Sequence, residues 1–281
     1  MVDPGVTPHA QTPVKKRVVK FVRDAFGVSL RRACKTLGFH RSTQRYETRK
    51  DDADLTGKLR RLAADRPRFG YRCLHVLLRR DGEVVNHKRV YRVYRSLGLA
   101  VRKKTRRKGA AQGRVPTPPP GSRNERWSMD FVSDQLASGQ RFRVLNVVDD
   151  CTRECILSYA ATSIPGAVVA RLLSEAVKER GKPKVLLSDN GPEFTGKALD
   201  SWAFEHGIKQ EFIEPGKPMQ NAYIKSFNGR MRDEFLNTHW FLSLPQARLS
   251  LSVWRRDYND VRPHSSLGNL APHEFARRLA G

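Results

Sequence analysis

The sequence predicts a mixed α/β protein, in which an all-helical, strongly basic N-terminal region precedes a core of alternating strands and helices. Two observations support this prediction. The 281 residues carry a formal net charge of +25, and residues 1–126 hold 33 of the 53 basic side chains but only 10 of the 28 acidic ones. The hydrophobic pattern also changes from a helical to a strand period near Trp127. A basic half joined to a nearly neutral half is typical of proteins that bind a polyanion.

The composition excludes several classes of protein. With 39% hydrophobic residues the chain can bury a core, which excludes wholesale disorder. No apolar run reaches the length of a membrane span and the first residues lack the apolar segment of a signal peptide, so we expect a cytoplasmic protein without a membrane partner. The cysteines include no CxxC pair and are expected to be reduced thiols: Cys34, Cys73, Cys151 and Cys155.

Residues 1–13 contain three prolines and are predicted to form a disordered leader. Residues 14–50 are predicted to form a helix-turn-helix, because apolar side chains recur at helical spacing and a turn with Gly38 separates two helices. Ser29 is a suitable N-cap for the helix before that turn. In the first helix the buried stripe is predicted to comprise Val18, Phe21, Val22 and Ala25. The helix after the turn carries side chains suited to base edges and phosphates: His40, Arg41, Ser42, Gln44 and Arg45.

A second helical DNA-binding unit is predicted for residues 51–99. Leu55, Leu59 and Leu62 form an apolar stripe, and Asn86 can cap a helix that runs from His87 to Leu97. The outer face of that helix is expected to contact DNA through Lys88, Arg89 and Arg92. The alternative for the first unit is a plain helical hairpin with a solvated basic face, and for the helix His87–Leu97 it is a solvated basic face.

Residues 100–126 are predicted to be a basic, proline-rich linker. Its basic run would contact phosphate groups without sequence preference, through Arg102, Lys103, Lys104, Arg106 and Arg107. The prolines that follow cannot join a sheet and act as a stiff spacer.

The core is predicted to cover residues 127–236. Strands are expected at WSMDFV, RFRVLNVVDD, ECILSYA, KVLLSD and residues 208–213, and helices at residues 165–180, 197–207 and 219–236. This order predicts a mixed sheet with packed helices. Residues 237–281 are predicted to be a C-terminal helical extension, with one helix at residues 245–258.

Two carboxylates are placed where catalysis would use them. Asp130 interrupts an apolar strand, where a charged group is costly to bury. Asp189 follows a buried strand, at the carboxyl end where active sites of α/β proteins lie. Carboxylates on adjacent strands can bind Mg²⁺ or Mn²⁺ through oxygen, and a pair of such ions promotes phosphoryl transfer. A turn-capping role is the alternative for Asp189.

Several motifs of the chain resemble one family. WSMDFVSD, LNVVDDCTREC, SDNGPEF, PGKPMQNAYIKSFNGRMRDEFLN and YNDVRPHSSLG resemble, in this order, the integrase-core transposases encoded by the second reading frame of the insertion-sequence-three family. The resemblance covers nearly the whole chain. It implies a ribonuclease-H-like (retroviral-integrase-like) core and an Asp-Asp-Glu triad that binds two Mg²⁺ ions and cleaves and rejoins transposon DNA ends.

The resemblance assigns the first two members of the triad to Asp130 and Asp189. The third member falls at position 225, where this chain has Lys225 instead of the expected Glu. An ammonium group has no acceptor and cannot ligate a cation, so we expect weakened metal binding and lost or impaired catalysis. We expect Lys225 to pair with the two aspartates. None of the neighbouring carboxylates is expected to replace the missing Glu: Glu193, Glu214, Asp233 and Glu234.

The resemblance also implies partners. These are double-stranded DNA (transposon inverted-repeat ends and target DNA), further copies of the chain on that DNA, and a first-reading-frame protein, in a bacterial, nucleoid-associated setting. Additional DNA contacts are expected from the segment around the third triad position: Lys217, Gln220, Asn221, Asn228 and Arg230. The alternative function is that of a catalytically inactive DNA-binding protein, a decayed or engineered transposase that acts as an inhibitor or regulator.

Overall fold

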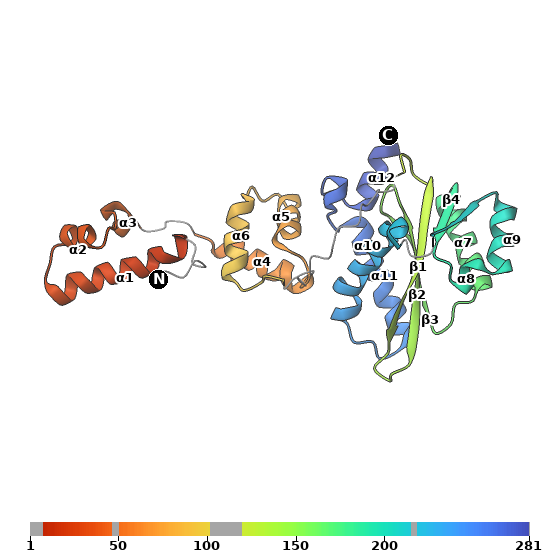
Figure 1. Ribbon diagram of the computed structural model, residues 1–281, viewed down its shortest axis with the longest axis horizontal. Helices are drawn as coiled ribbons and strands as arrows, with labels where there is room; N and C mark the ends of the chain where they lie inside the picture. Colours follow the sequence, from red (N-terminus) through yellow and green to blue (C-terminus); the bar gives the residue numbers. More distant parts are fainter. Residues whose placement is uncertain (1–7, 47–50, 102–119, 215–217, 281) are drawn as a thin grey trace. The chain divides into compact units, whose positions relative to one another are not determined.

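The computed structural model describes residues 8–46, 51–101, 120–214 and 218–280 (Figure 1). The chain divides into two compact units, Met1–Asp52 and Ala53–Gly281. The predicted DNA contacts of the linker and of the loop before residue 218 lie outside the described residues: Arg102, Lys103, Lys104, Arg106, Arg107 and Lys217.

The first unit contains three helices, α1 (Pro8–Phe26), α2 (Leu30–Thr36) and α3 (Arg41–Arg45). Helix α1 begins at Pro8, so the leader predicted for residues 1–13 is helical in its second half. Ser29 caps α2 as predicted, because its hydroxyl accepts a hydrogen bond from the backbone N–H of Arg32 at 3.3 Å.

The predicted buried stripe of α1 is wrong in phase. Val18 and Phe21 are exposed, whereas Val19 is fully buried against Ala33 and Cys34 of α2. Because α2 and α3 are short, they cover only a narrow strip of α1, and the strip is centred on Val19. Hydrophobic periodicity identified the helix but not the side of it that is covered.

The second unit begins with three helices, α4 (Ala53–Asp65), α5 (Tyr71–Arg80) and α6 (His87–Ser96). They share a buried apolar cluster that includes Leu59, Leu74 and Val90. Asn86 caps α6, since its side-chain oxygen accepts from the backbone N–H of Lys88 at 2.9 Å. The predicted cap and the predicted helix are therefore confirmed.

The rest of the second unit is built on a five-stranded sheet of order β3-β2-β1-β4-β5. Strands β1 (Arg126–Gln135), β2 (Arg141–Asp149) and β3 (Cys155–Ala161) are antiparallel neighbours. Strands β4 (Val185–Ser188) and β5 (Lys209–Phe212) follow in parallel beside β1. This mixed sheet is ribonuclease-H-like, and it confirms the predicted fold class and all five predicted strands.

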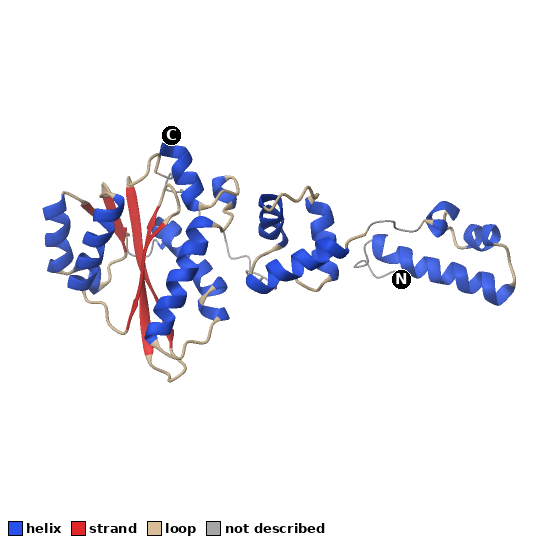
Figure 2. Cartoon of the chain, turned by 180° about the vertical axis from the view of Figure 1, so that it is seen from behind, coloured by secondary structure: helices blue, strands red, loops and turns tan. Residues whose placement is uncertain are grey.

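Helices cover both faces of the sheet (Figures 1 and 2). One face packs on α7 (Gly166–Arg180), α8 (Pro192–Thr195) and α9 (Lys197–His206). The opposite face packs on α10 (Ala222–Glu234) and α11 (Leu244–Asp260). The short helix α8, the final helix α12 (Pro272–Ala280) and the 3₁₀ turn at Ser265–Leu267 go beyond the predicted elements. The helix predicted for residues 219–236 is α10 with 3₁₀ turns at its two ends, Pro218–Asn221 and Leu236–Thr238.

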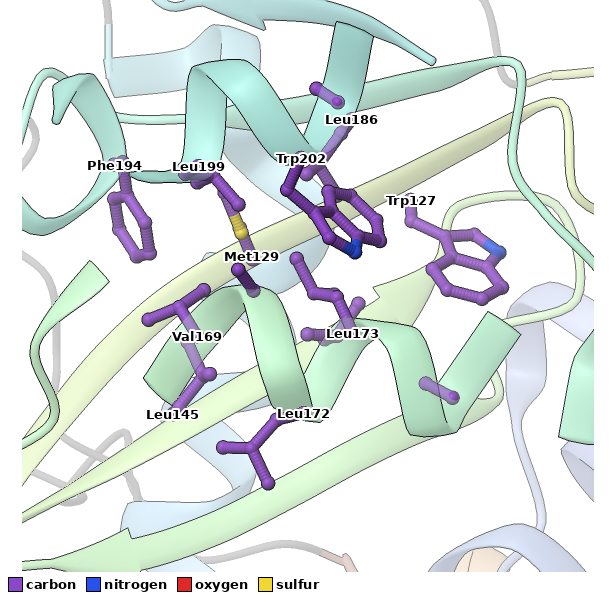
Figure 3. Close-up of a cluster of buried hydrophobic side chains, with 14 of the residues drawn as sticks. Trp127, Met129, Leu145, Val169, Leu172, Leu173, Leu186, Phe194, Leu199 and Trp202 are labelled. Atoms are coloured by element: carbon purple, nitrogen blue, oxygen red, sulfur yellow. The ribbon is translucent and has the colours of Figure 1, made fainter. Parts of the chain in front are cut away.

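The pleat of β1 determines which face receives each side chain. Trp127 and Met129 are fully buried on the α7 side, where they pack with Leu173 and Trp202 (Figure 3). Alternate residues point to opposite faces of a strand, so Asp130 lies on the side of α10. The strand thus presents one carboxylate to the helix that carries position 225.

The predicted boundary between a core ending at residue 236 and a C-terminal extension does not match the packing. Ala247, Leu251 and Tyr258 of α11 belong to the same buried cluster as Ile224 and Phe227 of α10. A single helix of 13 residues covers only part of this sheet face. Helix α11 completes it, and residues 237–281 therefore contribute to the core.

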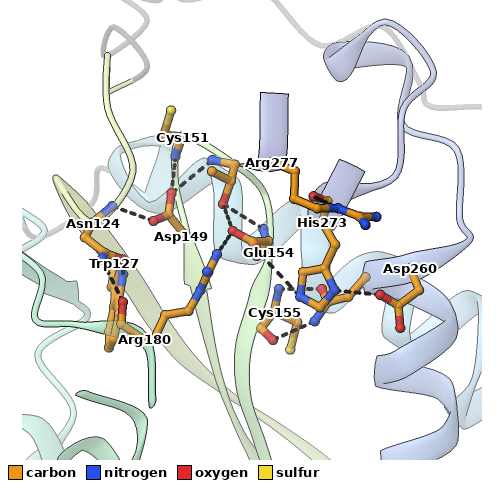
Figure 4. Close-up of polar contacts among 12 residues, drawn as sticks. Asn124, Trp127, Asp149, Cys151, Glu154, Cys155, Arg180, Asp260, His273 and Arg277 are labelled. Carbon is orange, nitrogen blue, oxygen red and sulfur yellow. Dashed lines mark hydrogen bonds and ion pairs between the residues drawn. The ribbon is translucent and has the colours of Figure 1, made fainter. Parts of the chain in front are cut away.

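Buried polar contacts hold the turn between β2 and β3 (Figure 4). The Asp149 carboxylate accepts hydrogen bonds of 2.8–2.9 Å from the backbone N–H groups of Asn124, Cys151 and Thr152. The buried Glu154 accepts from the Thr152 hydroxyl at 2.6 Å and forms an ion pair with Arg180 of α7. The acidic part of the LNVVDDCTREC motif is thus structural.

The described residues also bear on the state of the cysteines and on membrane-spanning helices. All four cysteines are free thiols, as predicted. Among the described helices, none combines the length and the apolar character that a membrane crossing requires.

Candidate functional site

The site begins with two carboxylates that the sheet brings together. The parallel register of β1 and β4 pairs Ser128 with Leu187, Asp130 follows Ser128 by two residues on β1, and Asp189 comes directly after the end of β4. Neighbouring strands are about 4.8 Å apart. The negative charge of Asp189 accordingly raises the pKa of Asp130. The structure therefore places both predicted aspartates in one site.

The surroundings of Asp130 oppose its ionisation. Burial of this half-buried carboxyl raises its pKa, and Asp189 raises it further. Hydrogen bonds from the backbone N–H of Phe131 at 2.8 Å and the side-chain amide of Asn228 at 3.0 Å lower it, as does the charge of Lys225. The net direction is upward, because burial and the charge of Asp189 outweigh these donors and the charge of Lys225 at Asp130.

Lys225 is on α10, close enough for its charge to lower the pKa of Asp130. Its side chain is exposed. In the described part of the chain it forms no ion pair with Asp130 or Asp189, so the predicted direct pairing is absent. An exposed ammonium keeps its hydration shell, which a close ion pair would partly remove.

Glu193 of α8 is the carboxylate nearest to Asp189 in the chain. A β-carbon at Gly191 would lie 3.1 Å from Asp189 Oδ1 and 3.4 Å from Glu193 Oε2, so both groups face the same small space. Glu193 forms an ion pair with Arg143 of β2, which holds the pKa of Glu193 below its usual value. Glu193 is therefore already neutralised by a fixed guanidinium.

The remaining candidate carboxylates are also engaged elsewhere. Asp233 pairs with Arg68, and Glu234 pairs with Arg262. Glu214 accepts a hydrogen bond from the Gln220 amide at 2.8 Å. The described residues include no group of three or more His, Cys, Asp or Glu side chains that could hold a metal ion. Two carboxylates and an ammonium do not fit the donor set of a two-metal centre.

Asn228 is a site residue whose role the sequence did not reveal. Its Nδ2 donates to Asp130, and its Oδ1 accepts from Asn146 of β2 at 2.9 Å. Asn146 in turn accepts from the Ser158 hydroxyl at 2.6 Å. This chain of hydrogen bonds fixes the orientation of the Asn228 amide and hence of the Asp130 carboxylate. The signal in the sequence is the spacing of three residues from position 225, which places both on one side of α10.

Replacing Asn228 with Ala is expected to raise the pKa of Asp130 further, because the carboxylate loses a donor. Carboxyl-carbon NMR titration of Asp130 measures the change, with Asn237→Ala as a control at an exposed position beyond α10. An unchanged or lowered pKa in Asn228→Ala would contradict this role. Since the folded pKa lies above the unfolded one, Asp130 lowers stability as pH rises through the folded pKa.

Other residues predicted to contact DNA from this segment are revised. Asn221 is buried and donates to the Met129 carbonyl at 3.3 Å, and Asn228 is buried against the sheet. Arg230 is partly buried near Arg262 and Tyr258. Burial disfavours direct contact of Asn221 and Asn228 with DNA, whereas a contact of the partly buried Arg230 with DNA stays a prediction. Gln220 is partly buried and hydrogen-bonds the loop at Glu214.

In the helical units the predicted DNA contacts are mostly exposed. Arg41 and Arg45 are on the surface of α3. The His40 ring caps the start of that helix, where its Nδ1 accepts from the backbone N–H of Ser42 and lies 2.6 Å from the Ser42 hydroxyl. Gln44 is an exception, because its amide donates to the Lys16 carbonyl at 3.2 Å and ties α3 to α1. On α6 the predicted contacts Lys88, Arg89 and Arg92 are all exposed. Their contact with DNA stays a prediction.

Domain families match three segments of the chain. An HTH-like domain matches residues 49–109, and two integrase core domains match residues 121–218 and 206–272. The HTH-like match falls on α4–α6, the unit that the sequence pattern placed second. The second integrase match includes α10 and α11, in agreement with their packing on one sheet face.

Several curated proteins are similar to the chain. A 31.7 kDa protein of insertion element IS407 from Burkholderia multivorans is 48% identical over 259 residues, covering 92% of this chain and 94% of the relative. A 39.2 kDa protein of IS476 from Xanthomonas euvesicatoria is 46% identical, covering 93% and 76%. The transposase InsD of insertion element IS2 from Escherichia coli is 28% identical, covering 82% and 80%.

Two solved structures that resemble the chain are those of viral integrases. The catalytic core domain of HTLV-2 integrase, solved in complex with magnesium, has a TM-score of 0.45 at 14% identity and covers 54% of this chain and 96% of that one. A chain of the simian T-cell lymphotropic virus intasome has a TM-score of 0.48 at 14% identity, with 79% and 74% covered. From its domains and its insertion-element relatives, the chain belongs to the transposase/integrase family in which an HTH-like domain is joined to an integrase core.

Proposed function

We propose that the protein is a transposase of the insertion-sequence-three type that binds transposon-end DNA, and that its own strand-transfer chemistry is lost or impaired by Lys225. The observation that carries the proposal is the composition of the site. Asp130 of β1 is close enough to Asp189, which directly follows β4, for the charge of Asp189 to raise the pKa of Asp130, and the position on α10 that the family pattern reserves for Glu holds a lysine. An integrase core with this composition retains its shape and lacks its third oxygen ligand.

In this family Mg²⁺ or Mn²⁺ would supply activation of the attacking oxygen and stabilisation of the leaving oxygen. The residues present do not fit that role. The ammonium of Lys225 adds a positive charge close to Asp130, where a cation would have to bind, and it has no acceptor with which to ligate that cation. Neither Glu193 nor Glu234 can supply the missing ligand without breaking its ion pair with an arginine.

DNA binding is supported independently of this site. The excess positive charge lies in residues 1–126, and α6 exposes Lys88, Arg89 and Arg92 on the unit that matches the HTH-like domain. Such side chains neutralise phosphates and release counterions. We further propose that the protein assembles with other copies on DNA, with inverted-repeat ends and target DNA as substrates and a first-reading-frame protein as a partner.

The DNA-binding half is tested by equilibrium binding over a range of salt concentrations. Affinity for unrelated duplex DNA is expected to fall by roughly 10³-fold or more between about 50 and 200 mM salt, the range for six to ten phosphate contacts. Binding to inverted-repeat ends is expected to stay selective at the higher salt. Equal affinity for both duplexes at every salt concentration would contradict recognition of transposon ends.

A second function is favoured by the same lysine. A protein that binds ends without cutting them acts as an inhibitor or regulator of active copies. Mixing it with an active relative is expected to reduce strand transfer in proportion to its share of the assemblies. If the relative's activity is unaffected at saturating amounts, the inhibitor function is excluded.

A further inference from the structure

A basic groove lies along the edge of the sheet, away from the Asp130 site. It has a volume of about 460 Å³ and is formed by β3, α11 and the start of α12. Strand β3 is the outer strand of the sheet, two strands from the β1–β4 junction that holds Asp130 and Asp189. The side chains that give the groove its character are Tyr159, Arg248, Arg255, Arg256, Asn259 and His273.

Helix α11 covers the backbone of this outer strand with polar side chains. Arg248 Nε donates to the Ala160 carbonyl at 2.7 Å, and Arg255 donates to the Ile156 carbonyl at 3.4 Å. The Asn259 side chain accepts a hydrogen bond from the backbone N–H of Cys155 at 2.9 Å and donates one to the Cys155 carbonyl at 3.0 Å. An edge strand capped in this way is poorly suited to pair with a strand from another chain. The groove therefore offers side-chain donors rather than a free backbone edge.

The groove contains more donors than the protein itself uses. A guanidinium has five N–H donors, and the carbonyl contacts of Arg248 and Arg255 leave several of theirs unused. Arg256 is exposed, and within the described ranges it has neither a hydrogen-bond nor an ion-pair partner. The carboxylate lining the groove, Asp260, is held by His273 at 2.6 Å (Figure 4). Three guanidinium groups thus face a groove with one carboxylate, which is already paired.

We propose that this groove binds the phosphodiester backbone of duplex DNA, as a contact surface of the core that is separate from the helical units. Arginine recognises phosphate through paired N–H donors, and the capping contacts hold Arg248 and Arg255 in place before DNA arrives. The Tyr159 ring lines the groove beside these arginines, and the Arg248 guanidinium lies over it at 5.2 Å from the ring centre. The proposal rests on the DNA-binding function proposed above and adds to it where the core touches DNA.

Protection of arginines in the full-length protein tests the groove directly. The protein is treated with an arginine-specific dicarbonyl reagent, with and without a duplex of unrelated sequence, and modified residues are located by mass spectrometry. Arg256 is expected to lose most of its modification when DNA is bound. Arg171 is the internal control, since it is exposed on α7 at the opposite face of the sheet, and its modification is expected to stay unchanged.

Charge reversal provides a matched pair of variants. Arg256→Glu is expected to weaken binding of the duplex and to reduce the slope of log affinity against log salt by about one, the effect of losing one phosphate contact. Arg171→Glu makes the same change in net charge and is expected to preserve the slope. Arg248 and Arg255 are left intact, because they also hold β3.

The outcomes separate this inference from the function on which it rests. If Arg256 is modified equally with and without DNA while Arg89 and Arg92 of α6 become protected, the groove is not a DNA surface and DNA binding still stands. If DNA protects none of these arginines and no binding is detected, the proposed function fails as well. Protection of Arg256 that increases with protein concentration in the absence of DNA would overturn the inference in favour of contact between copies of the chain.

Discussion

Lys225→Glu is expected to confer divalent-cation-dependent cleavage and joining of transposon-end DNA on a protein whose own activity is absent or weak. The substitution exchanges an ammonium that repels a cation for a carboxylate that can ligate one, opposite Asp130 and Asp189. We expect a rate increase of roughly 10²–10³-fold or more, the range associated with a group that stabilises charge in a transition state. The assay is strand transfer of labelled inverted-repeat ends with Mg²⁺ or Mn²⁺.

Two controls define the origin of this gain. Lys225→Gln removes the positive charge without adding a carboxylate, so it is expected to recover at most a small part of the activity. Adding Asp189→Asn to Lys225→Glu is expected to abolish it. Equal activity of the unchanged protein and Lys225→Glu would refute the proposal that Lys225 is the catalytic defect.

The same variant has a readout that does not depend on catalysis. Without a metal, Lys225→Glu is expected to raise the pKa of Asp130, because a charge that lowered it is replaced by one that raises it. Added Mg²⁺ is expected to reverse this shift in an NMR titration. A pKa of Asp130 that does not respond to Mg²⁺ would show that the third carboxylate does not complete a metal site.

Glu234→Ala is expected to lower the free energy of unfolding by about 3–5 kcal/mol, the usual cost of removing one partner from a buried ion pair. Glu234 and Arg262 are only 11% and 8% exposed, and two hydrogen bonds join them, one of them 2.7 Å long. Arg262 also lies over the Phe69 ring, at 5.5 Å from its centre. Removal of the carboxylate leaves this guanidinium charged and without its counter-charge, between α10 and the Phe69 ring of the segment that joins α4 to α5.

Among the described groups that stabilise the charge of Arg262, Glu234 is the one carboxylate, and the others are Tyr258 and Cys73. Arg230 is a second guanidinium beside Arg262, and burial together with Arg262 lowers its pKa. His264 is buried, and burial, Arg262 and Arg230 lower its pKa to about 2, so it stays neutral. Burial raises the pKa of Tyr258, which therefore stays neutral as well. The cluster would hold two positive charges and no counter-charge, which explains the large expected effect.

Chemical denaturation measures the change. The matched control is Glu211→Ala, which breaks the exposed Lys209–Glu211 pair on β5 and is expected to cost less than about 1 kcal/mol. A loss of less than about 1 kcal/mol in Glu234→Ala as well would show that the buried pair contributes no more than a surface pair. Glu234→Gln is expected to lie between the two, since it keeps the shape and one acceptor.

Local sequence patterns were sufficient for most elements of the fold. The five strands and the main helices follow from period and from turn residues, and caps such as Ser29 and Asn86 mark where helices begin. Patterns were not sufficient for the side of α1 that is buried or for the place of α11 in the core. Both depend on which other segments cover a surface, and a periodic pattern does not contain that information.

The candidate site shows the same division. Asp130 and Asp189 could be predicted because a carboxylate in an apolar strand and one at a strand end are unusual by position alone. Asn228 could not be separated from DNA-facing polar residues, since the same amide either contacts a ligand or orients a neighbouring carboxylate. The expected pairing of Lys225 with the aspartates also failed, because the side chain stays exposed.

The charge division between the two halves, the order of strands and helices, and the unusual positions of Asp130 and Asp189 can all be read from the amino-acid sequence. These are properties of composition and of local period, which neighbouring residues set. Which carboxylates form ion pairs with arginines depends on the tertiary structure. The same is true of the arginines of α11 that line the groove at the edge of the sheet. Those facts arise from contacts between residues far apart in the chain, where the register of strands and the packing of helices bring charges together.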